Sequence, residues 1–159
     1  MNRFFAAIAA LAAFAVPAPM AGAQVLLDAT NPAQIAQAIV AHGYRAQLET
    51  GQSGDPLIRS SAEGINFTLF FYGCDQGRDC RSIRYSTNFR VNPPPTVEKI
   101  NEWNNTKTIG MAAVTPDGLA RLGHHVALSG GVSEANLRAS YDLWRAALRQ
   151  YAEFVGFKR

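Results

Sequence analysis

The sequence predicts an α+β domain in which an antiparallel sheet carries its helices on one face. Two segments, 65–72 and 81–91, are dense in aromatic and β-branched residues and indicate strands. After Ser133, apolar residues recur every three or four positions, which indicates a long helix. Because strands follow one another with helices between them, the predicted order is α-β-β-β-β-α-β-β-α, with the helices packed on one side of the sheet.

The first 23 residues have the pattern of an export signal. A basic start at Met1–Arg3 precedes the apolar run Phe4–Val16, which is too short to cross a bilayer of about 30 Å at about 1.5 Å per residue. Small residues then lead to Ala23, after which we expect cleavage; the alternative is an uncleaved N-terminal helix. We therefore expect a periplasmic or secreted protein with a single domain over 24–159 and no stable membrane anchor.

The charge distribution argues against a nucleic-acid partner. The chain has a formal net charge of +3 and an isoelectric point near 9.1. Its lysines and arginines are scattered, and none of their runs is longer than the terminal pair Lys158 and Arg159. Binding to nucleic acid requires a basic stripe or patch, which the sequence lacks.

The N-terminal half predicts one helix and two strands. Asn31 can cap the helix, Pro32 suits its first position and Gly43 can end it. Segments 44–49 and 57–62 indicate strands, joined by the polar turn sequence GQSGDP. The apolar side of the helix is expected to consist of Ile35, Ile39 and Val40.

The C-terminal half predicts a short helix, a hairpin and the long helix. Thr96 can cap a helix over 97–105, and segments 107–114 and 119–128 can pair across the turn sequence TPDG. The long helix begins after Ser133. The expected apolar stripes are Val97, Ile100 and Trp103 on the short helix, and Leu137, Tyr141, Trp144, Leu148, Tyr151 and Phe154 on the long one.

Both cysteines of the chain lie between the two strongest strands. Cys74 ends one strand and Cys80 begins the next, so the five residues DQGRD would form a hairpin loop. Opposed residues in such a pair have Cα atoms about 4.5–5.5 Å apart, which suits a disulfide. The same register makes one face apolar (Phe71 with Ile83, Leu69 with Tyr85, Phe67 with Thr87, Ile65 with Phe89) and the other mostly polar (Tyr72 with Ser82, Phe70 with Arg84, Thr68 with Ser86, Asn66 with Asn88).

A structural disulfide is favoured over a redox or metal site. A thioredoxin-type site has its cysteines two residues apart at a helix start, unlike Cys74 and Cys80. A zinc site would need further ligands from His42, His124 and His125. Adjacent strand residues point to opposite faces, so we expect a neutral, half-buried His124, a solvent-facing His125 and no metal.

Four segments resemble the YbjN family, described as bacterial sensory transduction regulators: FTLFFYGC, CRSIRYSTNF, VEKINEWNNTKTIGMAAV and LSGGVSEANLRASYDLW. The resemblance extends from about Gln34 to Phe154. It implies a fold similar to the type III secretion chaperones, which bind protein clients and often dimerise. It does not imply an enzyme or a cofactor.

The family motif Asn101, Glu102, Trp103 and Asn104 allows two interpretations. Glu102 with its flanking asparagines could form a polar binding site beside the Trp103 ring. Alternatively, Trp103 is a core residue and the asparagines satisfy backbone groups where the helix ends. We favour the structural interpretation.

Two hypotheses about function follow. The first is a non-catalytic, chaperone-like or regulatory module whose sheet face, with Phe70, Tyr72 and Arg84, meets a protein client or a second copy in a homodimer. The second is a small enzyme, either a thiol oxidoreductase using Cys74 and Cys80 or a hydrolase. No Ser-His-Asp set is recognisable, and no glycine-rich phosphate loop is present, so we favour the first.

Overall fold

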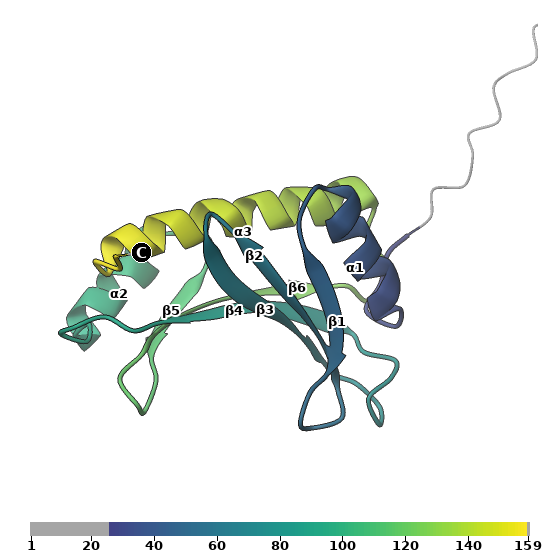
Figure 1. Cartoon of the computed structure of the whole chain (residues 1–159), viewed down its shortest axis with the longest axis horizontal. Coiled ribbons are helices and arrows are strands. Elements are labelled where there is room, and N and C mark those ends of the chain that lie inside the picture. Colours follow the sequence, from purple (N-terminus) through teal and green to yellow (C-terminus); the bar gives the residue numbers. More distant parts are fainter. Residues whose placement is uncertain (1–25, 159) are drawn as a thin grey trace, which may run out of the picture.

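The computed structural model describes residues 26–158, in which three helices lie on one face of a six-stranded antiparallel sheet (Figure 1). The strand order across the sheet is β1-β2-β3-β4-β6-β5. The predicted fold class and element order are confirmed, whereas the predicted signal peptide, 1–23, lies outside the described residues. The elements are α1 (Pro32–Ala41), β1 (Ala46–Thr50), β2 (Pro56–Ala62), β3 (Ile65–Tyr72), β4 (Ser82–Phe89), α2 (Val97–Thr106), β5 (Met111–Val114), β6 (Ala120–Ala127) and α3 (Glu134–Phe154).

Asn31 and Thr96 cap α1 and α2 as predicted, and Ser133, after which the long helix was predicted to begin, caps α3. The side-chain oxygens of Asn31, Thr96 and Ser133 accept hydrogen bonds from the backbone N–H three residues ahead, at 3.2, 3.3 and 3.1 Å. These bonds satisfy N–H groups that have no partner within the first helical turn. Pro32 occupies the first position of α1, where a missing N–H costs no helical hydrogen bond.

The β3–β4 register is the one predicted from the opposed cysteines. Phe71 lies opposite Ile83, and Leu69 lies opposite Tyr85. All four side chains are buried against the helices. Because successive strand residues alternate in direction, the polar set of this strand pair faces away from the helix layer.

An aromatic core fills the space between α3 and the sheet. Trp144 is fully buried, with its ring centroid 5.5 Å from that of Tyr85 and 5.7 Å from that of Phe67. The hydroxyl of Tyr141 forms a 2.8 Å hydrogen bond with Ser60 Oγ on β2, which ties α3 to the sheet. Burial raises the pKa of Tyr141 to about 12, so its hydroxyl stays neutral. The predicted stripe of α3 is buried at Leu137, Tyr141, Trp144, Leu148 and Tyr151 and partly buried at Phe154.

The strand predicted over 107–114 is shorter in the structure, because β5 begins only at Met111. The Lys107 N–H donates to the carbonyl of Trp103 at 2.9 Å and ends α2. Gly110 then adopts a φ of +84°, a conformation that favours glycine. The chain therefore turns between the helix and the strand.

Two apolar residues that were predicted to face the core are exposed. Val40 lies one position around α1 from Ile39, and only Ile39 is buried, so the buried stripe of α1 is narrower than predicted. Val97 is the first residue of α2 and precedes its contact with the core at Ile100. Both side chains therefore remain exposed to solvent.

Candidate functional site

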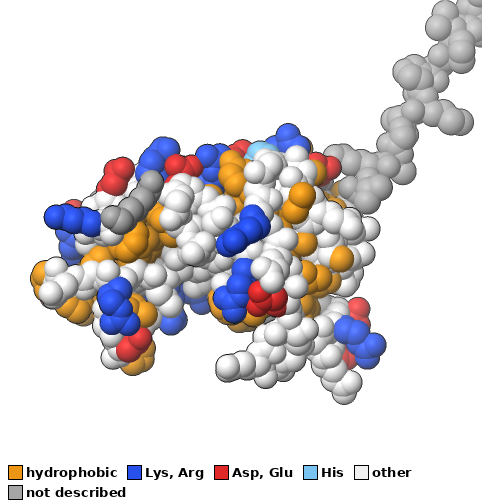
Figure 2. Space-filling view, in the orientation of Figure 1, with side chains coloured by type: hydrophobic (Ala, Val, Ile, Leu, Met, Phe, Trp, Pro, Cys, Tyr) orange, Lys and Arg blue, Asp and Glu red, His pale blue; other side chains and the backbone are white. Residues whose placement is uncertain are grey.

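Within residues 26–158, the sheet face opposite the helices carries no covering element (Figure 1). We call it the open face. The β1–β2 and β5–β6 loops project below this face on either side, and Figure 2 shows a recess between the two lobes that they form. The open face is therefore a concave surface bounded by loops.

The structure places the predicted interface residues Phe70, Tyr72 and Arg84 together on the open face. Phe70 lies directly opposite Arg84, and Tyr72 is the next outward residue along β3. The two aromatic residues are 37% and 43% exposed. Arg84 also lies opposite His125 of β6, whose ring centroid is 6.4 Å from that of Tyr72. We call these four residues the open-face cluster; aromatic residues and arginine are the types that most often anchor protein interfaces.

Gly123 determines where the Arg84 side chain can lie. A Cβ atom at this position would be 2.7 Å from the Nε atom of Arg84 and 2.7 Å from one of its terminal nitrogens. The guanidinium therefore rests on the β6 backbone, at a point where a side chain would collide with it. Gly123 was not predicted as a site residue, although a glycine inside a predicted strand is a recognised signal of such a close approach.

Two depressions meet at Phe70. One has a volume of about 470 Å³ and extends to the β1–β2 loop, and the other has a volume of about 360 Å³ and extends along β3 and β4. The β3–β4 loop packs closely against the β1–β2 loop, which lines the first depression. A Cβ atom at Gly77 would lie only 2.5 Å from the carbonyl oxygen of Gly54. Arg59 lines both depressions together with Phe70.

The family motif on α2 is engaged with the end of the sheet. Trp103 is buried, and its Nε1 donates to a backbone carbonyl in the loop before β5 at 2.7 Å. Asn104 pairs with the backbone of Ala112 on β5, donating to its carbonyl at 3.1 Å and accepting from its N–H at 2.8 Å. Asn101 and Glu102 are exposed on α2. The last two residues of the motif thus attach α2 to the edge strand.

A disulfide joins Cys74 to Cys80, with Cα atoms 3.8 Å apart. The cysteines were predicted to end one strand and begin the next, but they lie just beyond the strand ends, since β3 ends at Tyr72 and β4 begins at Ser82. The Cα spacing predicted for opposed strand residues therefore does not apply to them. Cys80 is only 2% exposed, and Cys74 is partly buried against the core. Because thiol exchange requires an accessible sulfur, this burial favours a structural role.

Replacement of both Cys74 and Cys80 by serine should lower the free energy of unfolding by about 2 kcal/mol, because the disulfide closes a short loop. Urea denaturation would measure the change. Wild-type protein unfolded with a reductant is the control and should match the variant. Equal stability of the oxidised wild type and the variant would contradict a stabilising role.

A polar cluster that the sequence did not reveal joins α1 to α3. His42 Nε2 lies 3.1 Å from Asp142 Oδ1. Arg145 contacts the same carboxylate at 3.2 Å and Glu63 Oε1 at 2.6 Å. Partial burial acts to raise the pKa of Asp142, but hydrogen bonds from His42 and Arg145 outweigh it and lower that pKa. The cluster therefore serves as an electrostatic link between the helices.

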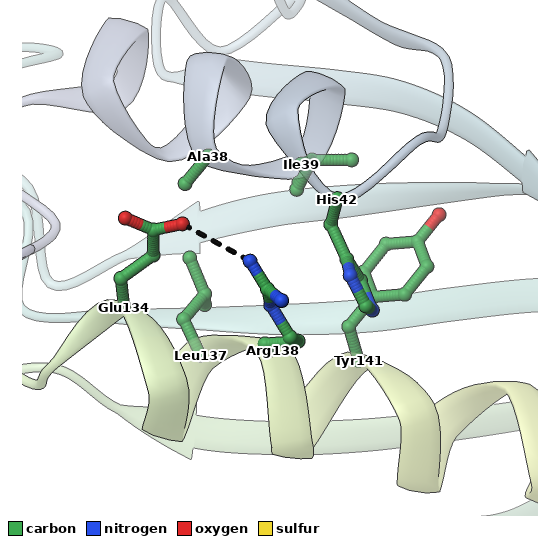
Figure 3. A pocket seen from close by; sticks show the side chains of 7 residues that line it. All are labelled: Ala38, Ile39, His42, Glu134, Leu137, Arg138 and Tyr141. Atoms are coloured by element: carbon green, nitrogen blue, oxygen red, sulfur yellow. Dashed lines mark hydrogen bonds and ion pairs between the residues drawn. The ribbon is translucent and has the colours of Figure 1, made fainter.

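The seam between α1 and α3 beside His42 has little room for a ligand. Figure 3 shows its lining, in which Glu134 and Arg138, both on α3, form an ion pair along one edge of the seam. The hollow measures about 10 Å³, enough for one water molecule. We therefore place the candidate site on the open face and not in this seam.

The other two histidines face opposite sides of β6, as predicted. His124 lies half-buried against Tyr85, and burial, with a smaller effect of the neighbouring His125, lowers the pKa of His124. Among residues 26–158, no group of three or more His, Cys, Asp or Glu side chains is arranged to hold a metal ion. Within the same residues, no helix has the length and apolar character needed to span a membrane.

Sequence comparison relates the chain to one family. The family model of YbjN, described as "Putative bacterial sensory transduction regulator", matches residues 31–157. The match includes every helix and strand that the structure describes in residues 26–158, from the cap of α1 to the residues after α3. No curated protein matches the chain. Because the match covers most of the sequence and the structure has the predicted order of elements, the chain belongs to the YbjN family.

Proposed function

We propose that this protein is an exported, non-catalytic interaction module that binds a protein client through the open face of its sheet. The open-face cluster is the observation that carries the proposal. It combines two exposed aromatic rings with a partly buried arginine on a concave, loop-bounded surface. Such residues supply much of the binding energy in protein interfaces. A regulatory role, as in the family description, would act through this binding.

A non-catalytic role is supported by how the potentially reactive side chains are engaged. His42 is held by Asp142 beside a hollow too small for a substrate. The Ser60 hydroxyl is buried and bonded to the Arg45 carbonyl at 2.7 Å. A thiol oxidoreductase, the alternative function, is less well supported because Cys80 is buried.

Export is inferred from the N-terminal sequence, whose apolar run ends in small residues before Gln24. The client would then be a periplasmic or secreted protein. N-terminal sequencing of the protein recovered from the periplasmic fraction should begin at Gln24. Recovery from the cytoplasm with Met1 retained would contradict export.

Photocrosslinking in cells tests the open face directly. A photoreactive phenylalanine analogue at Tyr72 should give adducts with a client, whereas the same analogue at Leu143, exposed on α3, should give none at that mass. Adding Phe70→Ser should reduce the Tyr72 adduct by about tenfold or more, because loss of a central aromatic anchor costs about 2 kcal/mol or more.

The two crosslinking positions also provide the contradicting outcome. Identical adducts from Tyr72 and Leu143, or adducts from Leu143 alone, would exclude the open face as the binding surface. Adducts with the mass of a homodimer would instead show that the open face binds a second copy of the chain and not a client.

A further inference from the structure

We propose that the client segment bound at the open face is acidic, and that Arg84 receives one of its carboxylates. This inference rests on the proposed function, because it assumes that the open face binds a protein. It adds the chemistry of the partner and names the residue that selects for it.

The charges on the open face favour an anionic partner. The pairing registers place three arginines on this face, Arg59, Arg84 and Arg121. They also place the acidic residue Glu49 there. Glu49 is already paired with Arg59 at 2.8 Å. Arg121 donates a hydrogen bond from its Nε to Asn88 Oδ1 at 3.2 Å. Among these three arginines, Arg84 alone forms no side-chain hydrogen bond or ion pair with another of residues 26–158, so we take it as the one available to an external carboxylate.

Arg84 has no acidic partner in the described part of the chain. None of its nitrogens lies within 4.0 Å of a carboxylate oxygen of residues 26–158. The side chain is nevertheless partly buried, in the middle of the sheet between Phe70 and His125. Partial burial without a counter-ion is unfavourable for a charged group, and a bound carboxylate would relieve that cost.

Gly123 allows the guanidinium of Arg84 to be held in position before a ligand binds. Because it has no Cβ, the Arg84 head group can lie against the β6 backbone. A guanidinium held in this way presents forked N–H donors that match a carboxylate, and little conformational freedom remains to be lost on binding. The exposed rings of Phe70 and Tyr72 lie beside it and can contact apolar neighbours of the acidic residue.

A second copy of the chain fits this surface less well. Two-fold pairing of open faces would bring the arginines of one protomer close to those of the other. Glu49 could not compensate, because it is engaged with Arg59 within its own chain. Like charges across an interface weaken association, so the charge pattern favours an acidic client.

Fluorescence anisotropy with defined peptides tests the inference. The probe is a short fluorescein-labelled peptide that alternates glutamate with leucine and serine, and the matched peptide carries glutamine in place of glutamate. The purified protein should bind the glutamate peptide about tenfold or more tightly than the glutamine peptide. Arg84→Gln should weaken glutamate-peptide binding by about 10- to 100-fold, since hydrogen bonds to charged groups contribute about 1.5–3 kcal/mol.

Two further variants separate the effect of the position of the Arg84 head group from the effect of the net charge of the protein. Gly123→Ala keeps the net charge but displaces the Arg84 head group, so it should weaken binding of the glutamate peptide. Arg149→Gln removes one charge from an exposed position on α3 and should leave the affinity within about twofold, because that residue lies on the helix side. Circular dichroism should show that all three variants remain folded.

The outcomes distinguish the inference from the proposed function. Equal losses in Arg84→Gln and Arg149→Gln, or equal affinity for the two peptides, would overturn the acidic-client inference. In that case, crosslinks between position 72 and a client would still support the proposal that the open face binds a protein. A dimer in sedimentation velocity that dissociates in Arg84→Gln would assign the face to a second copy and also overturn the inference.

Discussion

Replacement of Trp144 by alanine is expected to lower the free energy of unfolding by about 3–5 kcal/mol, the usual cost of removing a fully buried aromatic side chain. The indole is fully buried and contacts the rings of both Tyr85 and Phe67. Its removal would leave a cavity between α3 and the middle of the sheet. Urea denaturation monitored by far-ultraviolet circular dichroism would measure the change, because the signal does not depend on the lost tryptophan.

Leu143→Ala is the matched control, because Leu143 precedes Trp144 on the same helix but is 49% exposed. This variant should change the free energy of unfolding by about 0.5 kcal/mol or less. If the two variants were equally stable, α3 would not pack on the sheet through the face that carries Trp144.

Trp103→Ala is expected to have a similarly large effect, about 3–5 kcal/mol, at the other end of the core. Its ring lies 4.8 Å from that of Tyr151 and 5.4 Å from that of Phe154, between centroids. Its Nε1 also satisfies the carbonyl of Gly110. Trp103→Phe would keep most of the packing but leave that carbonyl without its donor, so it should cost less than the alanine variant. Thermal and urea unfolding would rank the two.

The exposed neighbour Glu102 separates the two interpretations of the family motif. Glu102→Gln should leave both stability and crosslinking from Tyr72 unchanged if the motif is structural. A loss of client adduct in Glu102→Gln with unchanged stability would instead favour a polar binding site on α2.

Local sequence patterns are sufficient to predict the order of helices and strands and the side of the sheet to which each side chain of the central strands points. Capping residues mark the helix starts, and period-two alternation in β3 and β4 separates a buried apolar face from a polar one. The same alternation assigns Phe70, Tyr72 and Arg84 to one surface. Sequence alone is enough here because strand geometry decides which way each of these side chains points.

The neighbours of those residues, in contrast, depend on the tertiary structure. Pairing of β6 with β4 brings His125 and Gly123 to Arg84, although they are separated from it by about forty residues of sequence, including α2 and β5. Packing of α3 on α1 likewise brings Asp142 to His42. Such contacts depend on how whole elements pack against one another, and no local spacing of residues encodes that packing.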